Sequence, residues 1–210
     1  MIRLLIADDH EIFREGIKRI CEDNPDIEVA DEANNGNEVL DKVVKEEFDL
    51  LVLDIAMPGL NGLDTLKQLK TLKPKLRVLV LSMYPEDQYA IRAIKAGAAG
   101  YLTKARASYE LIEAIRKVAA GGNYISASVA ETLLFDTKLN HSKPPHETLS
   151  DREYQIFRLL VKGKKVGEIA DELNLSVKTV STYKVRILDK MEMASSAELV
   201  KYAIENKLML

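Results

Sequence analysis

A carboxylate follows directly on an apolar run in the N-terminal half of the chain. Asp54 comes after Leu50–Leu53, and Pro58, Gly59 and Gly62 follow it within eight residues. A short run of large apolar residues bounded by turn-forming residues predicts a buried strand. Asp54 is therefore expected at the C-terminal end of that strand, where ligand sites form in open parallel sheets.

Other side chains capable of chemistry follow apolar runs in the same way. Asp8 and Asp9 follow one run, Ser82 ends another, and Thr103 and Lys104 follow a third. Three carboxylates repel one another unless a cation lies among them, and a ligand set made of oxygens favours Mg²⁺ over Zn²⁺. The central carboxylate would then be a nucleophile toward a phosphoryl group, with Mg²⁺ and the lysine neutralising charge and the serine donating a hydrogen bond.

Each of these residues also has a plainer interpretation. Asp8 and Asp9 could favour the start of the helix that follows them, Asp54 could cap a turn, and Lys104 could be a solvated loop charge. The chance that all of these residues lie at strand ends without a shared function is much smaller than the chance that any one of them has its plainer interpretation. The combination therefore favours a site.

The elements that must position these residues alternate along the first 121 residues. Strands are predicted at Arg3–Ala7, Ile27–Ala33, Asp49–Leu53, Arg77–Leu81 and Gly100–Leu102. Helices are predicted at Ile12–Glu22, Asn37–Glu46, Gly62–Leu72, Glu86–Ala96 and Ser108–Ala120. Five such units with apolar strands predict an α/β doubly wound five-stranded parallel sheet with helices on both faces.

Four segments of this half closely resemble the receiver domain of two-component response regulators. They are "LLIADDH", "LLVLDIAMPGLNGL", "VLVLS" and "AIKAGAAGYLTK", and the likeness runs through essentially all of residues 1–121. The resemblance implies a flavodoxin-like receiver domain over residues 1–122. In that family a partner histidine kinase passes its phosphoryl group to the central aspartate.

The resemblance also implies a role for each residue of the site. Asp54 would be the phosphoacceptor, Asp9 a direct Mg²⁺ ligand, Asp8 a ligand through metal-bound water, and Ala56 a ligand through its backbone carbonyl. Ser82 would be the switch hydroxyl, Lys104 the phosphate-binding lysine, and Tyr101 the aromatic that rotates inward when Ser82 moves. One departure is that Ala105 follows Lys104 where many receivers have a cis proline, and a non-proline cis bond costs roughly 2.5–4 kcal/mol.

After residue 122 the pattern changes. Residues 123–147 contain the Pro144–Pro145 pair and read as a linker, with a short helix near Val129–Phe135. Residues 148–210 are expected to be all helical, with four helices, and Ser150 with Glu153 forms a capping box for the first. Three features suggest a helix-turn-helix: the apolar face of Ile169, Ala170 and Leu173, the turn "NLS", and the helix that starts near Val177. The outer face of a helical bundle would give a similar periodicity.

The same segment resembles the LuxR-type DNA-binding domain of NarL/FixJ-class response regulators. The match spans about Thr148–Ala203 and includes "LSDRE" and "EIADELNLSVKTVSTYKVRILDKM". The resemblance implies that Val177–Met191 is the recognition helix. Lys178, Ser181, Thr182 and Val185 are then candidates for base edges, and Lys165, Thr179, Lys184 and Arg186 for phosphates, with Lys184 reaching out from near the apolar face.

The C-terminal end of this domain is less clearly specified. The family usually has Leu-Gly where this chain has Met191–Glu192. In the last helix, about Ser196–Asn206, the resemblance assigns Leu199, Val200 and Ala203 to a dimer contact. Packing of these three against their own domain is the alternative.

Composition narrows the class of protein. Apolar residues make up 47% and charged residues 30%, the net charge is −3, and no apolar run is long enough to cross a membrane. A single cysteine, Cys21, excludes an internal disulfide. Without a signal-peptide pattern at its N-terminus the protein is expected to be cytoplasmic. Residues Lys162–Lys190 carry seven basic and four acidic side chains, a modest indication of a nucleic-acid face.

The sequence thus predicts a transcriptional response regulator that accepts a phosphoryl group on Asp54, which switches dimerisation and promoter binding. Expected partners are a sensor histidine kinase, double-stranded promoter DNA and a second copy of the chain when active, with RNA polymerase a further candidate. The protein is expected to be no enzyme beyond slow self-dephosphorylation. One rival is a Mg²⁺-dependent phosphatase of the haloacid dehalogenase type, which wants a second acid where Ala56 stands. Another is a phosphorylation-independent regulator with a vestigial pocket.

Overall fold

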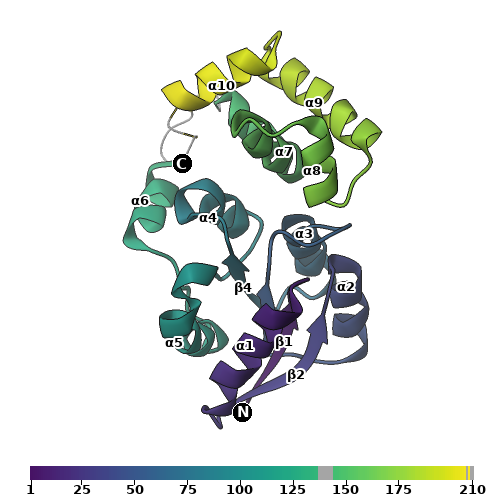
Figure 1. Ribbon diagram of the computed structural model, residues 1–210. Helices are drawn as coiled ribbons and strands as arrows, with labels where there is room; N and C mark the ends of the chain where they lie inside the picture. The colour runs from purple at the N-terminus through teal and green to yellow at the C-terminus, as the bar shows by residue number, and fades with distance from the viewer. Residues whose placement is uncertain (137–143, 207, 209–210) are drawn as a thin grey trace. The chain divides into compact units, whose positions relative to one another are not determined.

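The computed structural model describes residues 1–136, 144–206 and 208. Contacts divide the chain into two compact units, Met1–Leu139 and Asn140–Leu210 (Figure 1). Each unit has its own secondary structure and its own packed interior, and each is described by itself below.

The N-terminal unit is built on a sheet of five parallel strands. They are β1 (Ile2–Ala7), β2 (Ile27–Ala33), β3 (Leu50–Leu53), β4 (Arg77–Ser82) and β5 (Gly100–Thr103), in the order β2-β1-β3-β4-β5. The predicted fold class is confirmed, and the predicted strand bounds differ by no more than one residue at either end.

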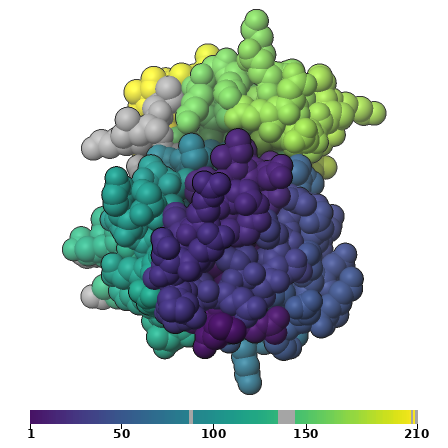
Figure 2. Space-filling model, turned by 60° about the horizontal axis from the view of Figure 1, so that its bottom comes forward, coloured from purple at the N-terminus to yellow at the C-terminus, as the bar shows by residue number. Residues whose placement is uncertain are grey.

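Five helices cover this sheet. One layer holds α1 (Glu11–Glu22) and α5 (Ala107–Ala119), which contact each other, and Figure 2 shows their surfaces side by side. The helices α2 (Gly36–Lys45), α3 (Gly62–Leu72) and α4 (Glu86–Lys95) pack in a row.

Both faces of the sheet are buried, which explains the continuous apolar runs of the strands. Leu4, Ile6, Leu50 and Val52 belong to the core cluster that also contains α1 and α5. The strand residues between them, such as Leu5 and Leu51, are buried as well.

The chain beyond α5 stays with the first unit. Tyr124 pairs with Gly100 of β5, and α6 (Ala127–Asp136) packs against α4. The helix expected near Val129–Phe135 is therefore present and extends by two residues at its start and one at its end. Residues 137–143 of the predicted linker lie outside the described residues, so the linker bounds 123–147 stay a prediction.

The C-terminal unit begins with a short 3-10 turn, η2 (Pro145–Glu147), and continues with helices. They are α7 (Asp151–Val161), α8 (Val166–Glu172), α9 (Val177–Met191) and α10 (Ser196–Glu205). The predicted capping box is present, because Glu153 N donates to Ser150 Oγ and Ser150 N donates to Glu153 Oε2. Across the described part of both units, every helix is too short or too polar to cross a membrane.

Candidate functional site

The strand ends bring an ammonium and two carboxylates into direct contact. Lys104 Nζ lies 2.8 Å from Asp54 Oδ2 and 2.5 Å from Asp8 Oδ2. All three side chains are less than 5% exposed. The sequence thus correctly placed these three residues together, because parallel strands in register end at the same edge of the sheet.

Local backbone contacts fix the position of Asp54. Its amide donates to the carbonyl of Ala7 across the strand pair at 2.9 Å. Ala56 N donates to Asp54 Oδ1 at 3.2 Å, which holds the carboxylate over the turn. The start of α3 comes so close that a Cβ on Gly62 would lie 2.1 Å from the Asp54 carbonyl oxygen. Only glycine leaves room for this approach, which accounts for one glycine of the "MPGLNG" turn.

Burial and charge act against each other in this cluster. Burial raises the pKa of the Asp54 carboxyl, and the charge of Asp8 adds to the rise, while Lys104 opposes both. Burial acts to lower the pKa of the Lys104 ammonium, but the carboxylates of Asp54 and Asp8 outweigh it, so that pKa is raised. The Phe13 ring lies 4.5 Å below the ammonium and adds a cation–π contact. Lys104 is therefore held in its charged form.

The residues present fit a divalent cation. Asp8, Asp9, His10 and Asp54 can each offer one ligand atom, with all four atoms within 4.8 Å of one another. Asp9 Oδ1 is buried and accepts no hydrogen bond, although His10 Nδ1 lies 2.9 Å away. A buried carboxylate oxygen that accepts no hydrogen bond is the feature expected of a ligand atom whose partner is a cation. The Asp8, Asp9 and Asp54 donors are the oxygen ligands that suit Mg²⁺.

Ser82 and Tyr101 lie beside this cluster in a fully buried arrangement. Ser82 Oγ accepts from Tyr84 N at 3.2 Å, and the Tyr101 hydroxyl donates to Tyr84 O at 2.8 Å. The Tyr101 ring is only 1% exposed. The Tyr101 ring therefore already lies in the inward position, and the expected inward rotation would not move it from where it lies in this structure.

The segment after β5 departs from the strand geometry. Residues Lys104–Arg106 form a 3-10 turn, η1, that leads directly into α5. The Lys104–Ala105 peptide bond is trans, as are the other peptide bonds of the described residues. The peptide bond before Ala105 is thus an ordinary trans bond, as expected from the free-energy cost of a cis bond before a residue other than proline.

The second candidate site is the α8–turn–α9 motif of the C-terminal unit. Leu175 N donates to the Ala170 carbonyl, and Asn174 takes a positive φ of 49° in the turn between the helices. Ser176 Oγ then accepts from Thr179 N at 3.0 Å and caps α9. The predicted helix-turn-helix arrangement is present.

The two faces of α9 agree with the sequence prediction. Val180, Ile187 and Met191 are buried, and Val185 is 57% exposed on the other side. The remaining candidates for DNA contact are exposed or half-buried: Lys165, Lys178, Ser181, Thr182 and Arg186 are exposed, and Thr179 and Lys184 are half-buried. Their DNA contacts stay a prediction.

The outer face of α9 is hollowed. A shallow depression of about 300 Å³ is lined by Lys178, Thr179, Thr182, Tyr183 and Arg186. The Arg186 guanidinium lies 5.9 Å from the centre of the Tyr183 ring. Basic and hydroxyl groups around a concave strip of helix suit the oxygens of a phosphodiester backbone.

The three α10 residues that the resemblance assigns to a dimer contact differ in exposure. Leu199 and Ala203 are buried, at 1% and 0% exposed, and α10 packs on α7. This is the alternative in which these side chains pack within their own domain. Val200 is half-buried, so the dimer contact as proposed retains only this residue as accessible surface.

Sequence reasoning missed three residues that the structure brings to these sites. His10 and Phe13 lie at the carboxylate cluster, and Tyr183 lies beside Arg186. His10 adjoins the acidic pair, which was a usable signal. Phe13 and Tyr183 carry no signal beyond helical spacing, because a ring contact with a distant cation depends on tertiary packing.

Comparison with known proteins agrees with both halves. The response regulator receiver domain model matches residues 4–116, and that of the bacterial regulatory proteins of the luxR family matches residues 147–203. Response regulator GacA of Pseudomonas viridiflava is 39% identical over 209 residues, which cover 98% of this chain and 97% of that relative. Response regulator UvrY of Escherichia coli (strain K12) is 36% identical over 209 residues, with 99% and 96% covered.

A solved structure gives the same likeness over almost the whole chain. RcsB from Salmonella enterica serovar Typhimurium, bound to promoter rprA in the presence of the phosphomimetic BeF3⁻, has a TM-score of 0.63 and 25% identity. The match covers 96% of this chain and 98% of that one. The chain belongs to the response regulators of the NarL/FixJ class, in which a receiver domain is followed by a LuxR-type DNA-binding domain.

Proposed function

We propose that this chain is a transcription regulator whose DNA binding is controlled by phosphorylation of Asp54. The observation that carries the proposal is the buried contact of Lys104 Nζ with Asp54 Oδ2 and Asp8 Oδ2 at the strand ends. The raised Lys104 pKa supports a permanent positive charge at the point where phosphoryl oxygens would arrive. A surface ion pair would not need such burial.

The acceptor reaction is a single phosphoryl transfer. A carboxylate oxygen of Asp54 attacks the phosphorus of a phosphohistidine on the sensor kinase, an O–P bond forms, and the N–P bond breaks with its electron pair returning to the imidazole. Asp54 is held for this attack by Ala56 N and by the close approach of Gly62. Positioning and charge neutralisation dominate such transfers, and Lys104 supplies both.

A Mg²⁺ ion would be held by Asp8, Asp9 and Asp54, and it would neutralise charge on the transferring group. Ala56 would add its backbone carbonyl, as the resemblance to receivers implies. Ser82 Oγ, which accepts from Tyr84 N, would turn to donate to a phosphoryl oxygen. Ala56 stands where a phosphatase of the haloacid dehalogenase type needs a second acid, which supports a role as phosphoacceptor with at most slow self-dephosphorylation.

The output would be binding of double-stranded promoter DNA by α9. Lys178, Ser181, Thr182 and Val185 would face base edges, and Lys165, Thr179, Lys184 and Arg186 would contact phosphates. The RcsB complex with a promoter supports promoter binding by this domain, because that structure is similar to this chain over 96% of its length. We propose a homodimer as the active form, with RNA polymerase a further candidate partner.

Intact mass spectrometry tests the acceptor residue directly. The protein is incubated with Mg²⁺ and acetyl phosphate, and a gain of about 80 Da, the mass of one phosphoryl group, is expected. Asp54→Asn removes the nucleophile with little change in size, so this variant is expected to gain nothing.

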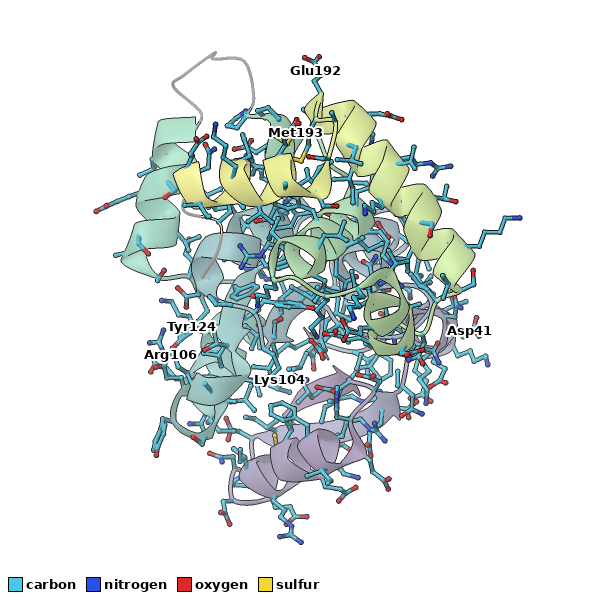
Figure 3. All side chains as sticks on the ribbon, turned by 45° about the horizontal axis from the view of Figure 1, so that its top comes forward. Asp41, Lys104, Arg106, Tyr124, Glu192 and Met193 are labelled. Carbon is cyan, nitrogen blue, oxygen red and sulfur yellow. The ribbon has the colours of Figure 1, made fainter. Side chains whose placement is uncertain are left out.

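The matched control is Asp41→Asn. Asp41 is an exposed acid of α2, and it lies well apart from Lys104 in Figure 3. This variant is expected to gain the same mass as the parent. Equal labelling of the parent and of Asp54→Asn would contradict the proposal, and so would an unlabelled parent that is folded and binds Mg²⁺.

A further inference from the structure

The start of the predicted linker is the last strand-like element of the receiver sheet. Tyr101 N donates to the Tyr124 carbonyl at 2.9 Å, and Tyr124 N donates to the Ala99 carbonyl at 3.0 Å. A Cβ on Gly100 would lie 3.0 Å from Tyr124 Cβ and from its carbonyl oxygen, so glycine is what allows this approach. The linker therefore begins beside β5 and is hydrogen-bonded to it. The same strand carries Tyr101 and leads to Lys104.

A chain of side-chain hydrogen bonds runs from this point to Arg106, in the turn that begins at Lys104. The Tyr124 hydroxyl donates to Glu110 Oε2 at 2.7 Å, and Arg106 Nε donates to Glu110 Oε1 at 2.7 Å. Arg106 lies two residues after Lys104 in the same 3-10 turn. Figure 3 shows Lys104, Arg106 and Tyr124 in one region of the first unit.

Two further contacts hold the same segment. Arg106 Nη1 lies 3.3 Å from Glu86 Oε1, at the first residue of α4. The helix α6, which begins three residues after Tyr124, packs against α4. The segment from Tyr124 through α6 is thus attached to β5 at its start and to α4 along its helix.

The surroundings of the Tyr124 side chain keep its hydroxyl protonated and hydrogen-bonded. Burial raises the pKa of Tyr124 to about 12, and the hydrogen bond to Glu110 adds to the rise. Lys117 Nζ lies 5.6 Å from the centre of its ring. The side chain is therefore fixed by two contacts, with Glu110 and with Lys117, as well as by its backbone pairing.

We propose that Arg106, Glu110 and Tyr124 are positioning residues that hold the linker segment 123–136 on the sheet edge while Asp54 is unphosphorylated. This inference rests on the proposed function, and it names the route by which the acceptor site controls the segment leading to the DNA-binding domain.

The physical reason lies in the shared turn. A phosphoryl group on Asp54 brings roughly −1.5 to −2 charge to the strand ends, so the Lys104 ammonium turns from the carboxylates to the phosphoryl oxygens. Lys104 and Arg106 belong to one short 3-10 turn, so this movement displaces Arg106 from Glu110 and Glu86. Tyr124 then loses a fixed acceptor. Because Tyr101 is already buried, its rotation offers no alternative route from this state.

The experiment compares the parent with Tyr124→Phe by hydrogen exchange of segment 123–136, before and after treatment with acetyl phosphate and Mg²⁺. Intact mass is taken on every sample to measure phosphoryl uptake. Exchange in the unphosphorylated variant is expected to be about fivefold faster than in the parent, as for loss of one hydrogen bond. Phosphoryl uptake is expected to be unchanged, and the exchange increase on phosphorylation to shrink to less than about half that of the parent.

The matched control is Tyr109→Phe. Tyr109 lies on the same helix as Glu110 and is 90% exposed, so its hydroxyl is expected to matter little. Glu110→Gln is a second variant that keeps the size of the side chain while weakening both of its bonds, and it is expected to behave as Tyr124→Phe.

The outcomes separate the two hypotheses. Phosphoryl uptake with the same exchange response in the parent and in both variants would overturn this inference and leave the proposed function intact. Faster exchange in the variants with a full response to phosphorylation would also overturn it, because it would show a structural role alone. A parent that takes up no phosphoryl group would overturn both.

Discussion

Lys104 carries the positive charge that allows Asp8 and Asp54 to lie together away from water. Its ammonium is within 2.8 Å of both carboxylates, and its side chain is 4% exposed. A charge buried this deeply is stable only while its partners remain, so each member of the cluster depends on the others.

Replacing Lys104 by methionine keeps the volume and removes the charge. We expect the free energy of unfolding of Lys104→Met to fall by about 3 kcal/mol at neutral pH without Mg²⁺, the low end for breaking a buried pair, because Asp54 can take up a proton instead. Added Mg²⁺ should recover more stability in the variant than in the parent. Urea denaturation measures both. Lys73→Met, which removes the half-buried partner of the exposed Glu47, should cost less than about 1 kcal/mol.

The pH dependence of this loss has a definite sign. The pKa of the Asp54 carboxyl is raised in the folded protein, and loss of Lys104 raises it further. Such a group costs stability as pH rises above its ordinary value of 3.8 and up to its folded pKa. The deficit of Lys104→Met should therefore be smaller at pH about 5 than at pH about 8. A deficit that is equal at both values would contradict the raised pKa.

The acids and the lysine of this site were predictable residue by residue, since each lies within two residues of the end of an apolar run. Their partners were less so. Phe13 lies on α1 at ordinary helical spacing, and only the packing of α1 brings its ring to Lys104. The orphaned oxygen of Asp9 likewise depends on the angle at which His10 lies, which no local pattern specifies.

At the scale of elements, the strands of the sheet were predictable as continuous apolar runs bounded by turn residues, and the helices that cover it by the regular repeat of their buried face. The pairing of Tyr124 with β5 could not be predicted in this way. A single bridge has no period, and Tyr124 follows two glycines and an asparagine that indicate only a turn. The capping box of α7 was predictable because both of its partners lie within one turn.

The end of α9 is the element whose geometry the sequence left open. Glu192 takes φ 55° and ψ 44°, the left-handed conformation, and Met193 N donates back to the Leu188 carbonyl. Figure 3 labels both residues, where the chain leaves α9. The helix therefore ends as it would with glycine, but with a side chain that disfavours this conformation.

Glu192→Gly should relieve that cost. We expect the free energy of unfolding of the C-terminal unit to rise by about 1 kcal/mol, since glycine adopts the left-handed region without penalty. Glu192→Ala keeps the Cβ and should bring no gain, and Asn174→Gly should bring less, because asparagine tolerates this region at its φ of 49°. Urea denaturation compares the three, and equal gains for glycine and alanine at 192 would refute the explanation.

At the scale of the whole molecule, a chain of net charge −3 must bind a polyanion through one local surface. We propose that this surface is the hollow of α9, which is lined in part by Lys178 and Arg186. Affinity for DNA should then fall steeply with salt, since each phosphate contact releases counterions.

Arg186→Ala tests this at a single position. We expect weaker binding to a duplex selected by the phosphorylated parent, and a slope of log affinity against log salt that is smaller by about one. Lys201→Ala on α10 removes another charge, from a side chain that is 77% exposed, and should leave the slope unchanged. Fluorescence anisotropy across a salt series measures the slopes. If both variants lost the same amount of slope, the effect would come from the overall charge of the protein and not from a contact of Arg186 with DNA.

The bridge between Tyr124 and β5 also decides where the two domains can be separated. A fragment that stops at Gly122 would leave the backbone N–H and C=O groups of β5 without their neighbour, and bare strand edges recruit other chains. Such a fragment is expected to aggregate, whereas one that ends at Asp136 keeps the edge covered and α4 packed against α6. The receiver is thus expected to need more than its five βα repeats to stay soluble by itself.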